Sequence, residues 1–313
     1  MTEIASNTTG GTRAGDNIGR GIALMIVVVL VFGAQDAISK ILVQDYSPFQ
    51  IVMVRYWAFA ALSLFLASRQ APLRRALQSR FPLLQVLRGV LLMGDIWFFG
   101  LALRTVPLAE LQAITLVYPL LVTLIAIPLL GEHVGAFRIW AVIAGFFGAM
   151  VIVRPGGLPF DVGVAFALGS AASYAVYTVL TRKVAQFDST PTSMVYAGLV
   201  GLVLSTATGV WVWKPMSPNA LILVGVLMVT MCIGHGLMMK ALALAPASVL
   251  QPFSYLSLPW GITLSFVVFG HLIDPISLLG AGVIAAAGLV VMWRERRKAR
   301  LSPAPAEALG PRD

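Results

Sequence analysis

Long apolar segments separated by short polar breaks run through the whole sequence. About 20 apolar residues in a helix span the hydrocarbon core of a bilayer, so each segment of that length predicts a membrane-spanning helix. The predicted spans are 20–43, 48–67, 81–102, 107–130, 136–153, 160–181, 192–213, 219–242, 247–269 and 275–293. This pattern predicts an all-α membrane protein with ten transmembrane helices.

The breaks between the predicted helices combine turn-forming residues with charge, as in Lys214-Pro215 and Asp274-Pro275. Residues 1–19 are polar and lack a small-residue cleavage site, which indicates a disordered N-terminus followed by an uncleaved first helix. Residues 294–313 form a basic tail. Between these ends, residues 20–154 and 160–293 hold five predicted helices each.

The composition supports a membrane protein, because 58% of the residues are hydrophobic and 11% are charged, against about 25% charged in a soluble domain. A net charge of +9 would suggest a nucleic-acid partner, but the basic residues stand in short clusters between apolar segments. This placement is typical of loops in a membrane protein and does not indicate a nucleic-acid partner. The single Cys232 lies in an apolar segment, so we expect neither a disulfide framework nor a cysteine metal site.

The distribution of Lys and Arg predicts the orientation in the membrane. Cytoplasmic loops retain positive charge, and ten spans place both termini on one side. That side carries most of the basic residues, whereas the other side carries Lys40, Arg104, Arg154 and Lys214. We therefore expect a bacterial inner-membrane protein with both termini in the cytoplasm.

The second half of the sequence repeats the first. A shift of 139 residues places Pro107 on Pro246, Gln112 on Gln251 and Gly131 on Gly270. Because each half has five predicted helices, an odd number, the second half enters the membrane inverted relative to the first. Such repeats enclose a site near the midplane that opens alternately to either side, and they need no catalytic chemistry.

Several motifs resemble those of the EamA-type drug/metabolite transporters. They are Ala109-Glu110-Leu111-Gln112-Ala113, Tyr118-Pro119-Leu120, Leu130-Gly131-Glu132 and Ile152-Val153-Arg154-Pro155-Gly156, with a second copy from Ala247 to His271. The resemblance covers roughly residues 18–295. It implies two inverted five-helix repeats and transport of metabolites, since similar proteins export amino acids or import riboflavin or S-adenosylmethionine. The sequence departs from the family pattern at His271, where Glu is usual.

Four ionisable residues stand out inside the predicted helices, because charge is costly there and marks candidate functional sites. Asp36, Arg55 and Asp95 share a depth about 10 Å below the non-cytoplasmic surface, by helical rise. Two carboxylates beside one guanidinium leave a surplus negative charge, so Asp36 or Asp95 is a candidate proton-coupling site. Alternatively, Arg55 and its partner only hold helices together. His235, at the mirrored depth, is either a proton-binding or a packing residue.

Gln112 and Gln251 are candidate substrate contacts, because they are hydrogen-bonding groups at repeat-related positions. The alternative is a hydrogen bond between helices. Aromatic residues at similar depth are further candidates, although some must only pack: Trp97, Tyr118, Tyr174, Tyr177, Tyr255 and Trp260. Such a lining suits a flat, uncharged ring with polar groups and favours a riboflavin-like compound.

Two prolines in the middle of predicted helices, Pro119 and Pro259, are candidate hinges, because proline removes a helical hydrogen bond. We interpret Arg88 as a side chain that reaches the membrane surface. Glu110 is interpreted as a cap in the first turn of its helix.

Other function classes fit the sequence less well. The three His residues are widely scattered, so neither a catalytic pair nor a metal site is indicated, and we expect no enzyme and no cofactor. The sequence contains no phosphate-binding glycine loop, so nothing in it indicates an ATP-driven pump. An exporter of amino acids and a channel stay open as alternatives, although paired prolines favour alternating access. Substrate, coupling ion and oligomeric state are open at this point.

Overall fold

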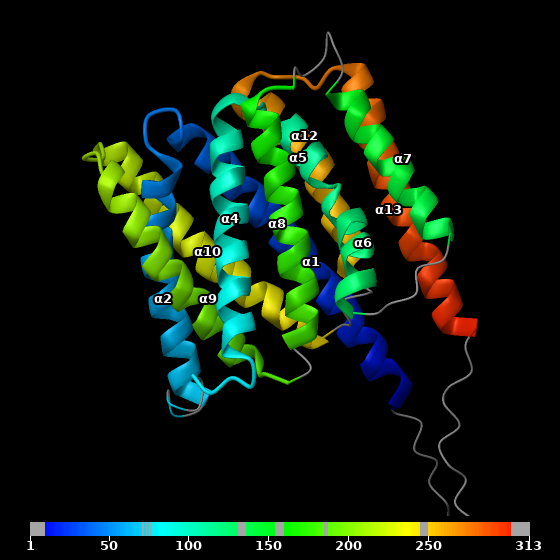
Figure 1. Cartoon of the computed structure of the whole chain (residues 1–313), viewed down its shortest axis with the longest axis horizontal. Coiled ribbons are helices and arrows are strands. Elements are labelled where there is room, and N and C mark those ends of the chain that lie inside the picture. Colours follow the sequence, from blue (N-terminus) through cyan, green and yellow to red (C-terminus); the bar gives the residue numbers. More distant parts are fainter. Residues whose placement is uncertain are drawn as a thin grey trace, which may run out of the picture.

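The computed structural model describes residues 10–70, 72, 74, 77–130, 136–153, 160–184, 187–244 and 250–301 (Figure 1). In the first half the helices are α1 (Gly10–Leu42), α2 (Pro48–Gln70), α4 (Pro82–Thr105), α5 (Leu108–Thr115), α6 (Tyr118–Leu130) and α7 (Ala136–Ile152). In the second half they are α8 (Val162–Val184), α9 (Thr190–Gly209), η1 (Val210–Val212), α10 (Pro218–Leu244), η2 (Gln251–Leu256), α12 (Ser257–Phe269) and α13 (Pro275–Leu301). These ranges contain no β-strand.

Seven of the described helices contain an apolar span long enough to cross a membrane: Ile18–Leu42, Pro48–Arg69, Pro82–Thr105, Val162–Thr181, Pro191–Val212, Pro218–Met238 and Pro275–Arg294. Three shorter apolar helices, Leu108–Val122, Ile139–Ile152 and Phe253–Phe269, lie where the sequence predicts the other three spans. The prediction of an all-α membrane protein is confirmed. Helix α1 begins at Gly10 rather than at residue 20, because a polar turn precedes its apolar span.

Two of the predicted helices are broken at corresponding places. The span predicted over 107–130 is divided into α5 and α6 at Leu116 and Val117, and the span predicted over 247–269 changes from the 3₁₀-helix η2 to the α-helix α12 at Ser257. Pro119 and Pro259 lie in the first turn of the second piece, where a missing backbone N–H costs nothing. The two prolines therefore begin new helices, and the continuous helices predicted there are wrong.

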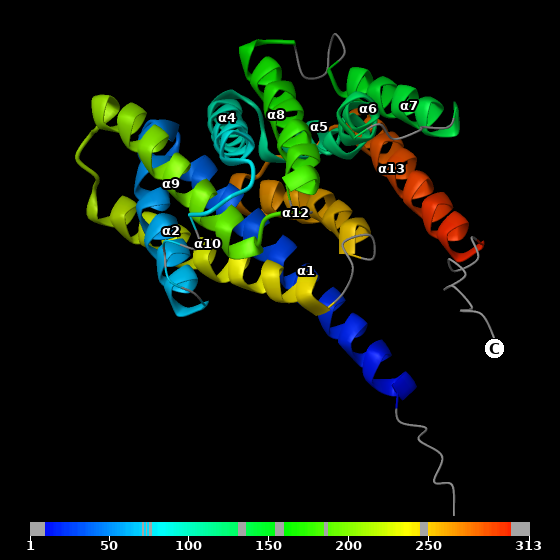
Figure 2. The same ribbon diagram turned by 60° about the horizontal axis from the view of Figure 1, so that its bottom comes forward.

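The helix pairings between the two halves are related by exchange of the halves. Helix α1 packs on α10 and α12, and the corresponding α8 packs on α4 and α6. Helices α2 and α9, which correspond to each other, pack together, and so do α7 and α13. Figures 1 and 2 show these pairs side by side. This arrangement is that of two repeats related by a two-fold axis.

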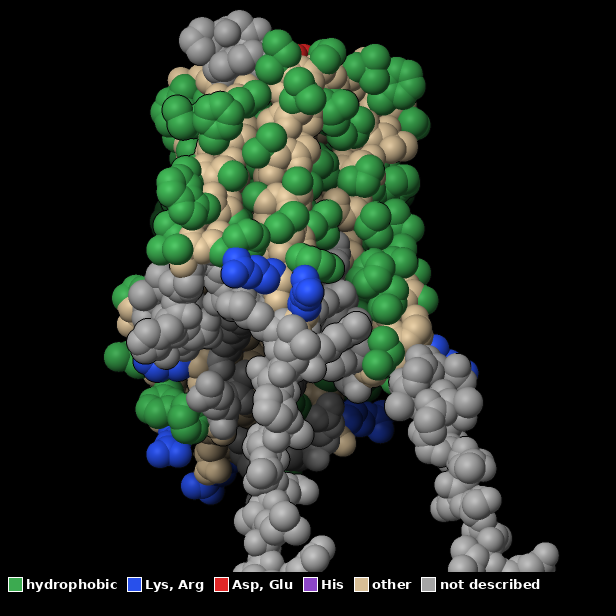
Figure 3. All heavy atoms as spheres, turned by 90° about the vertical axis from the view of Figure 1, so that its right-hand side faces the viewer, with side chains coloured by type: hydrophobic (Ala, Val, Ile, Leu, Met, Phe, Trp, Pro, Cys, Tyr) green, Lys and Arg blue, Asp and Glu red, His purple; other side chains and the backbone are tan. Residues whose placement is uncertain are grey.

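Small residues allow close approach where α7 crosses α13. A Cβ atom on Gly148 would lie 2.7 Å from the carbonyl oxygen of Gly280, so any larger residue there would push the helices apart. On the outer side of the same pair, Trp140, Phe147 and Met150 are exposed. Figure 3 shows this side covered by hydrophobic side chains, with Lys and Arg gathered toward the end where α1 begins and α13 ends. We call that end the terminal face, and the other end the opposite face.

Loops from the two halves are tied together at each face. At the opposite face, the Gln50 amide donates to the carbonyl of Lys214 (2.7 Å) and accepts from its N–H (2.9 Å). At the terminal face, Asp188 of the α8–α9 loop accepts hydrogen bonds from the Ser79 hydroxyl, the Arg80 N–H (2.9 Å) and the Gln85 amide (2.9 Å). The two clamps occupy corresponding loops of the inverted repeats.

The clamp at Asp188 is expected to depend on pH. Burial raises the pKa of this carboxyl, but the hydrogen bonds from Ser79, Arg80 and Gln85 outweigh burial and hold the pKa below its ordinary value. Its stabilisation is therefore complete above the ordinary pKa and is lost as the pH falls through the lowered one. At neutral pH, Asp188→Ala should lower the free energy of unfolding by about 1 kcal/mol, after solvent screening.

Denaturant titrations at neutral and acidic pH measure this effect, with Asp45→Ala on the exposed loop of the opposite face as the control. A deficit in Asp188→Ala that is equally large at both pH values would contradict the ionic origin of the clamp.

Candidate functional site

The structure brings three of the predicted polar residues together from three helices. The Gln112 amide of α5 donates to the Asp36 carboxylate of α1 at 2.7 Å. The Arg55 guanidinium of α2 attracts Asp36 electrostatically but donates its hydrogen bond to the Gln35 side-chain oxygen at 2.9 Å. Arg55 is therefore oriented by an uncharged neighbour, and Gln112 is the group that directly contacts the acid.

Asp95 of α4 has a different partner from the one the sequence suggests. Its carboxylate accepts a hydrogen bond from the Ser170 hydroxyl of α8 at 2.5 Å and is close enough to Asp36 to interact electrostatically. Arg55 thus acts on Asp36, which also lies near the carboxylate of Asp95, and ionisation of both acids would leave a net negative charge. A proton or a cationic group would balance that charge.

A cavity of about 40 Å³ lies between α1, α2 and α4, and Asp36, Ser39, Val43 and Arg55 belong to its lining. A water molecule needs at least about 10–15 Å³, so this space holds a few waters and no metabolite. This cavity beside Asp36, Arg55 and Gln112, which we call the acid site, is too small for an organic solute, so binding of one there requires the helices to separate.

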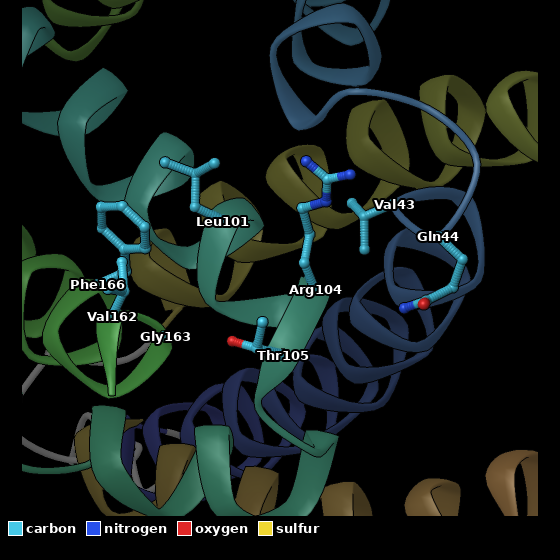
Figure 4. A pocket seen from close by; sticks show the side chains of 8 residues that line it. All are labelled: Val43, Gln44, Leu101, Arg104, Thr105, Val162, Gly163 and Phe166. Atoms are coloured by element: carbon cyan, nitrogen blue, oxygen red, sulfur yellow. The ribbon is translucent and has the colours of Figure 1, made fainter. Parts of the chain in front are cut away.

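A larger pocket of about 460 Å³ lies at the opposite face, between the end of α1, the end of α4 and the start of α8 (Figure 4). We call it the vestibule, and its lining residues are Val43, Gln44, Leu101, Arg104, Thr105, Val162, Gly163 and Phe166. Its volume is in the range of ligand pockets. Val43 lines both spaces, so the vestibule and the small cavity are neighbours, with this side chain between them.

Three predicted tyrosines form a continuous aromatic wall. The Tyr118 and Tyr174 rings meet edge to face with centroids 4.9 Å apart, and Tyr177 lies 5.7 Å from Tyr174. Both Tyr118 and Tyr174 lie near Asp95. The wall thus begins beside a carboxylate and continues along α8 to Tyr177.

Arg88 closes the far end of this wall, which corrects its interpretation as a surface-reaching side chain. Only 3% of Arg88 is exposed, and its guanidinium lies over the Tyr177 ring (5.5 Å) and donates to the Ser193 carbonyl (2.5 Å). An aromatic face and a carbonyl replace water for this cation, so it can stay inside the bundle.

The remaining aromatic candidates contact other helices. The Trp260 indole donates to the Leu30 carbonyl (3.0 Å) and packs on Gly33, and Trp97 packs against Phe49. Tyr255 is buried, and its hydroxyl occupies the space that Gly288 leaves open. The backbone of Gln251 begins η2, but its side chain lies outside the described part of the structure.

His235 is surrounded by aromatic rings. Its ring lies 5.4 Å from Phe32 and 5.0 Å from Phe59, and Nδ1 contacts the Met231 carbonyl of its own helix at 2.9 Å. Arg55 interacts with it electrostatically. These contacts favour the packing alternative over a proton-binding role.

Several polar partners in the site have no recognisable signal in the sequence. Gln35 and Ser170 are uncharged polar residues in largely apolar helices, and only their spatial position shows that they contact Arg55 and Asp95. Glu110 was interpreted as a helix cap, but its carboxylate contacts His271 at 2.8 Å. The departure from the family pattern at position 271 is the one sequence signal that could have drawn attention to this pair.

The fold and the buried polar site define a polytopic membrane protein made of two inverted repeats. The EamA-like transporter family matches residues 19–154 and 161–293, and the chain belongs to that family. It is a membrane transporter and not an enzyme.

Proteins similar to this chain have several substrates. The S-adenosylmethionine uptake transporter of Rickettsia prowazekii is 23% identical over 88% of this chain and 94% of its own length. The riboflavin transporter of Vibrio cholerae is 26% identical over 90% of this chain and 96% of its own length. The threonine/homoserine exporter of Escherichia coli is 25% identical over 73% of this chain and 77% of its own length. A crystal structure with 18% identity, covering 91% of this chain and 99% of the other, has the same fold with a TM-score of 0.62.

Proposed function

We propose that this protein imports a flat aromatic metabolite of the riboflavin type by alternating access, with protons as the coupling ion. The observation that carries the proposal is the tyrosine wall of Tyr118, Tyr174 and Tyr177 beside Asp95. Aromatic faces bind a planar ring, and a nearby carboxylate and amide bind its polar groups. The similarity to a riboflavin transporter supports the same substrate class.

In the proposed cycle, the opposite face is outside the cell and the solute enters through the vestibule. The solute passes Val43 and reaches the acid site, where it competes with Asp36 for the Gln112 amide. A proton on Asp36 weakens the Gln112 contact, because a charged acceptor binds an amide more strongly than a neutral one. The breaks at Pro119 and Pro259 then let the helices beside the site change direction.

A second candidate substrate is a cationic aromatic compound such as S-adenosylmethionine. The specific observation in its favour is the pair of carboxylates, Asp36 and Asp95, with one guanidinium nearby, because a cation would balance the surplus charge. The similarity to S-adenosylmethionine uptake transporters supports it as well.

Uptake of labelled riboflavin into proteoliposomes, with and without an imposed pH gradient, tests the proposal. We expect saturable riboflavin uptake that increases with the gradient. Gln112→Ala removes the amide that contacts the acid site and should reduce uptake about tenfold, as expected for loss of a hydrogen bond to a charged group. The matched control is Gln78→Ala, on an exposed loop.

Two results would contradict the riboflavin proposal. Uptake of S-adenosylmethionine without uptake of riboflavin would favour the cationic substrate. Accelerated loss of preloaded amino acids, with neither compound taken up, would favour an exporter.

A further inference from the structure

Glu110 and His271 link the two halves at the opposite face. Glu110 lies in the first turn of α5 with 7% of its side chain exposed, and His271 lies in the α12–α13 loop with 40% of its side chain exposed. The Glu110 Oε1 atom is 2.8 Å from the His271 Nε2 atom. Gly270, with a left-handed φ of 66°, ends α12 and turns the chain toward this contact. The partly exposed His271 side chain thus connects the buried carboxylate of Glu110 to the solvent.

The charges around this pair are few. From α1, Lys40 acts on Glu110 electrostatically, while its ammonium donates to the carbonyls of Leu103 (2.9 Å) and Val106 (2.8 Å) at the end of α4. Helix α12 has no ionisable residue, and α13 has none before Arg294.

Other ionisable groups at this end of the bundle have separate positions or partners. Asp274 of the same loop accepts from the backbone N–H groups of Ile276 and Ser277, and Asp161 before α8 accepts from that of Val164. Arg104, at the end of α4, lines the vestibule. Arg154, after α7, lies outside the described residues.

The carboxylate of Glu110 also has an unused acceptor. Its Oε2 atom is buried and has no hydrogen-bond partner among the described residues. The Oε1–Nε2 contact requires one hydrogen, which a neutral imidazole supplies from Nε2. A further proton from solution binds at Nδ1 and converts the contact to a charge-assisted one without breaking it. The pair therefore has room for one exchangeable proton.

We propose that Glu110 and His271 form a second proton-binding site, which takes its proton from the solution at the opposite face. Protonation strengthens the link between α5 and the α12–α13 loop and so favours closure of that face. The effect reaches the acid site through α5, because Gln112, which contacts Asp36, stands two residues after Glu110. This role in transport rests on the proposed proton coupling, but proton binding by the pair does not.

His271 gives Glu110 a hydrogen-bond donor at Nε2, which a carboxylate at position 271 could not supply.

The test without substrate compares the melting temperature of the purified full-length protein at pH 8 and pH 6. Because protonation strengthens the link, the change from pH 8 to pH 6 should favour the folded wild type more than the variants. The shift in melting temperature between the two pH values should be about 3 °C more positive in the wild type than in His271→Gln or Glu110→Gln. The double variant should behave as either single one does, because each single variant already lacks the charge-assisted contact between the carboxylate and the imidazolium. Asp45→Asn, on the exposed loop of the same face, should retain the wild-type difference. Equal pH dependence in the wild type and both single variants would overturn the proposal.

The test with substrate measures riboflavin uptake as the pH outside the proteoliposomes is varied. We expect His271→Gln to lose most of the response to outside pH while substrate exchange at constant pH continues. If the wild type takes up no riboflavin but shows the expected difference in melting temperature, the proposed substrate is rejected and the proton site is supported. An unchanged response to outside pH in His271→Gln would reject its role in coupling.

Discussion

Asp36→Asn is expected to abolish riboflavin accumulation driven by a proton gradient, reducing it at least about tenfold, to the level of empty liposomes. Asn has the same shape and still accepts the Gln112 amide, so the site should keep its structure and its substrate contact. It cannot bind and release a proton, however, so the gradient no longer drives uptake. Exchange of internal for external riboflavin at equal pH should therefore continue.

The measurement compares gradient-driven uptake with exchange for the wild type, Asp36→Asn and Asp95→Asn. Asp45→Asn, on the exposed loop at the opposite face, is the control. If Asp36→Asn retains the rate and pH dependence of the wild type while Asp95→Asn loses both, Asp95 is the coupling acid instead. If both variants behave as the wild type, neither acid couples transport to protons.

Much of the architecture could be predicted because lipid imposes a simple rule on the chain. Apolar length determines where helices lie, and the odd number of spans in each half determines the inversion. Helical rise also predicts a common depth for Asp36 and Arg55, and in the structure Arg55 acts on Asp36 electrostatically. The sequence could not show that Gln35, one residue before Asp36, orients the guanidinium, because that depends on how α1 is rotated against α2.

The errors have related causes. Proline inside an apolar segment is compatible with a kink or with a new helix, and the local sequence around Pro119 does not distinguish them. Depth alone could not tell that Arg88 faces a neighbouring helix rather than the membrane surface. The Glu110–His271 contact joins residues 161 positions apart, so only the folded repeats bring the two side chains together.

Arg55→Gln is expected to cause the largest loss of stability among these substitutions. The Arg55 guanidinium donates to Gln35 and compensates the charge of Asp36, so its removal leaves a carboxylate without its cation inside the bundle. Removing one partner of a buried charge pair costs about 3–5 kcal/mol. Unfolding in mixed detergent micelles should show this loss as a lower denaturant midpoint. Arg69→Gln, at the exposed end of the same helix, should show little change.

The double variant Arg55→Gln, Asp36→Asn separates the two interpretations of Arg55. If the guanidinium serves mainly to balance Asp36, neutralising the acid should restore at least about half of the lost stability, because residues in one polar network couple by about 0.5–3 kcal/mol. If the double variant is as unstable as Arg55→Gln alone, the hydrogen bond to Gln35 between α1 and α2 is the main contribution, and Arg55 holds helices together. A stable Arg55→Gln variant would contradict both interpretations, since each requires the cation to stabilise this part of the bundle.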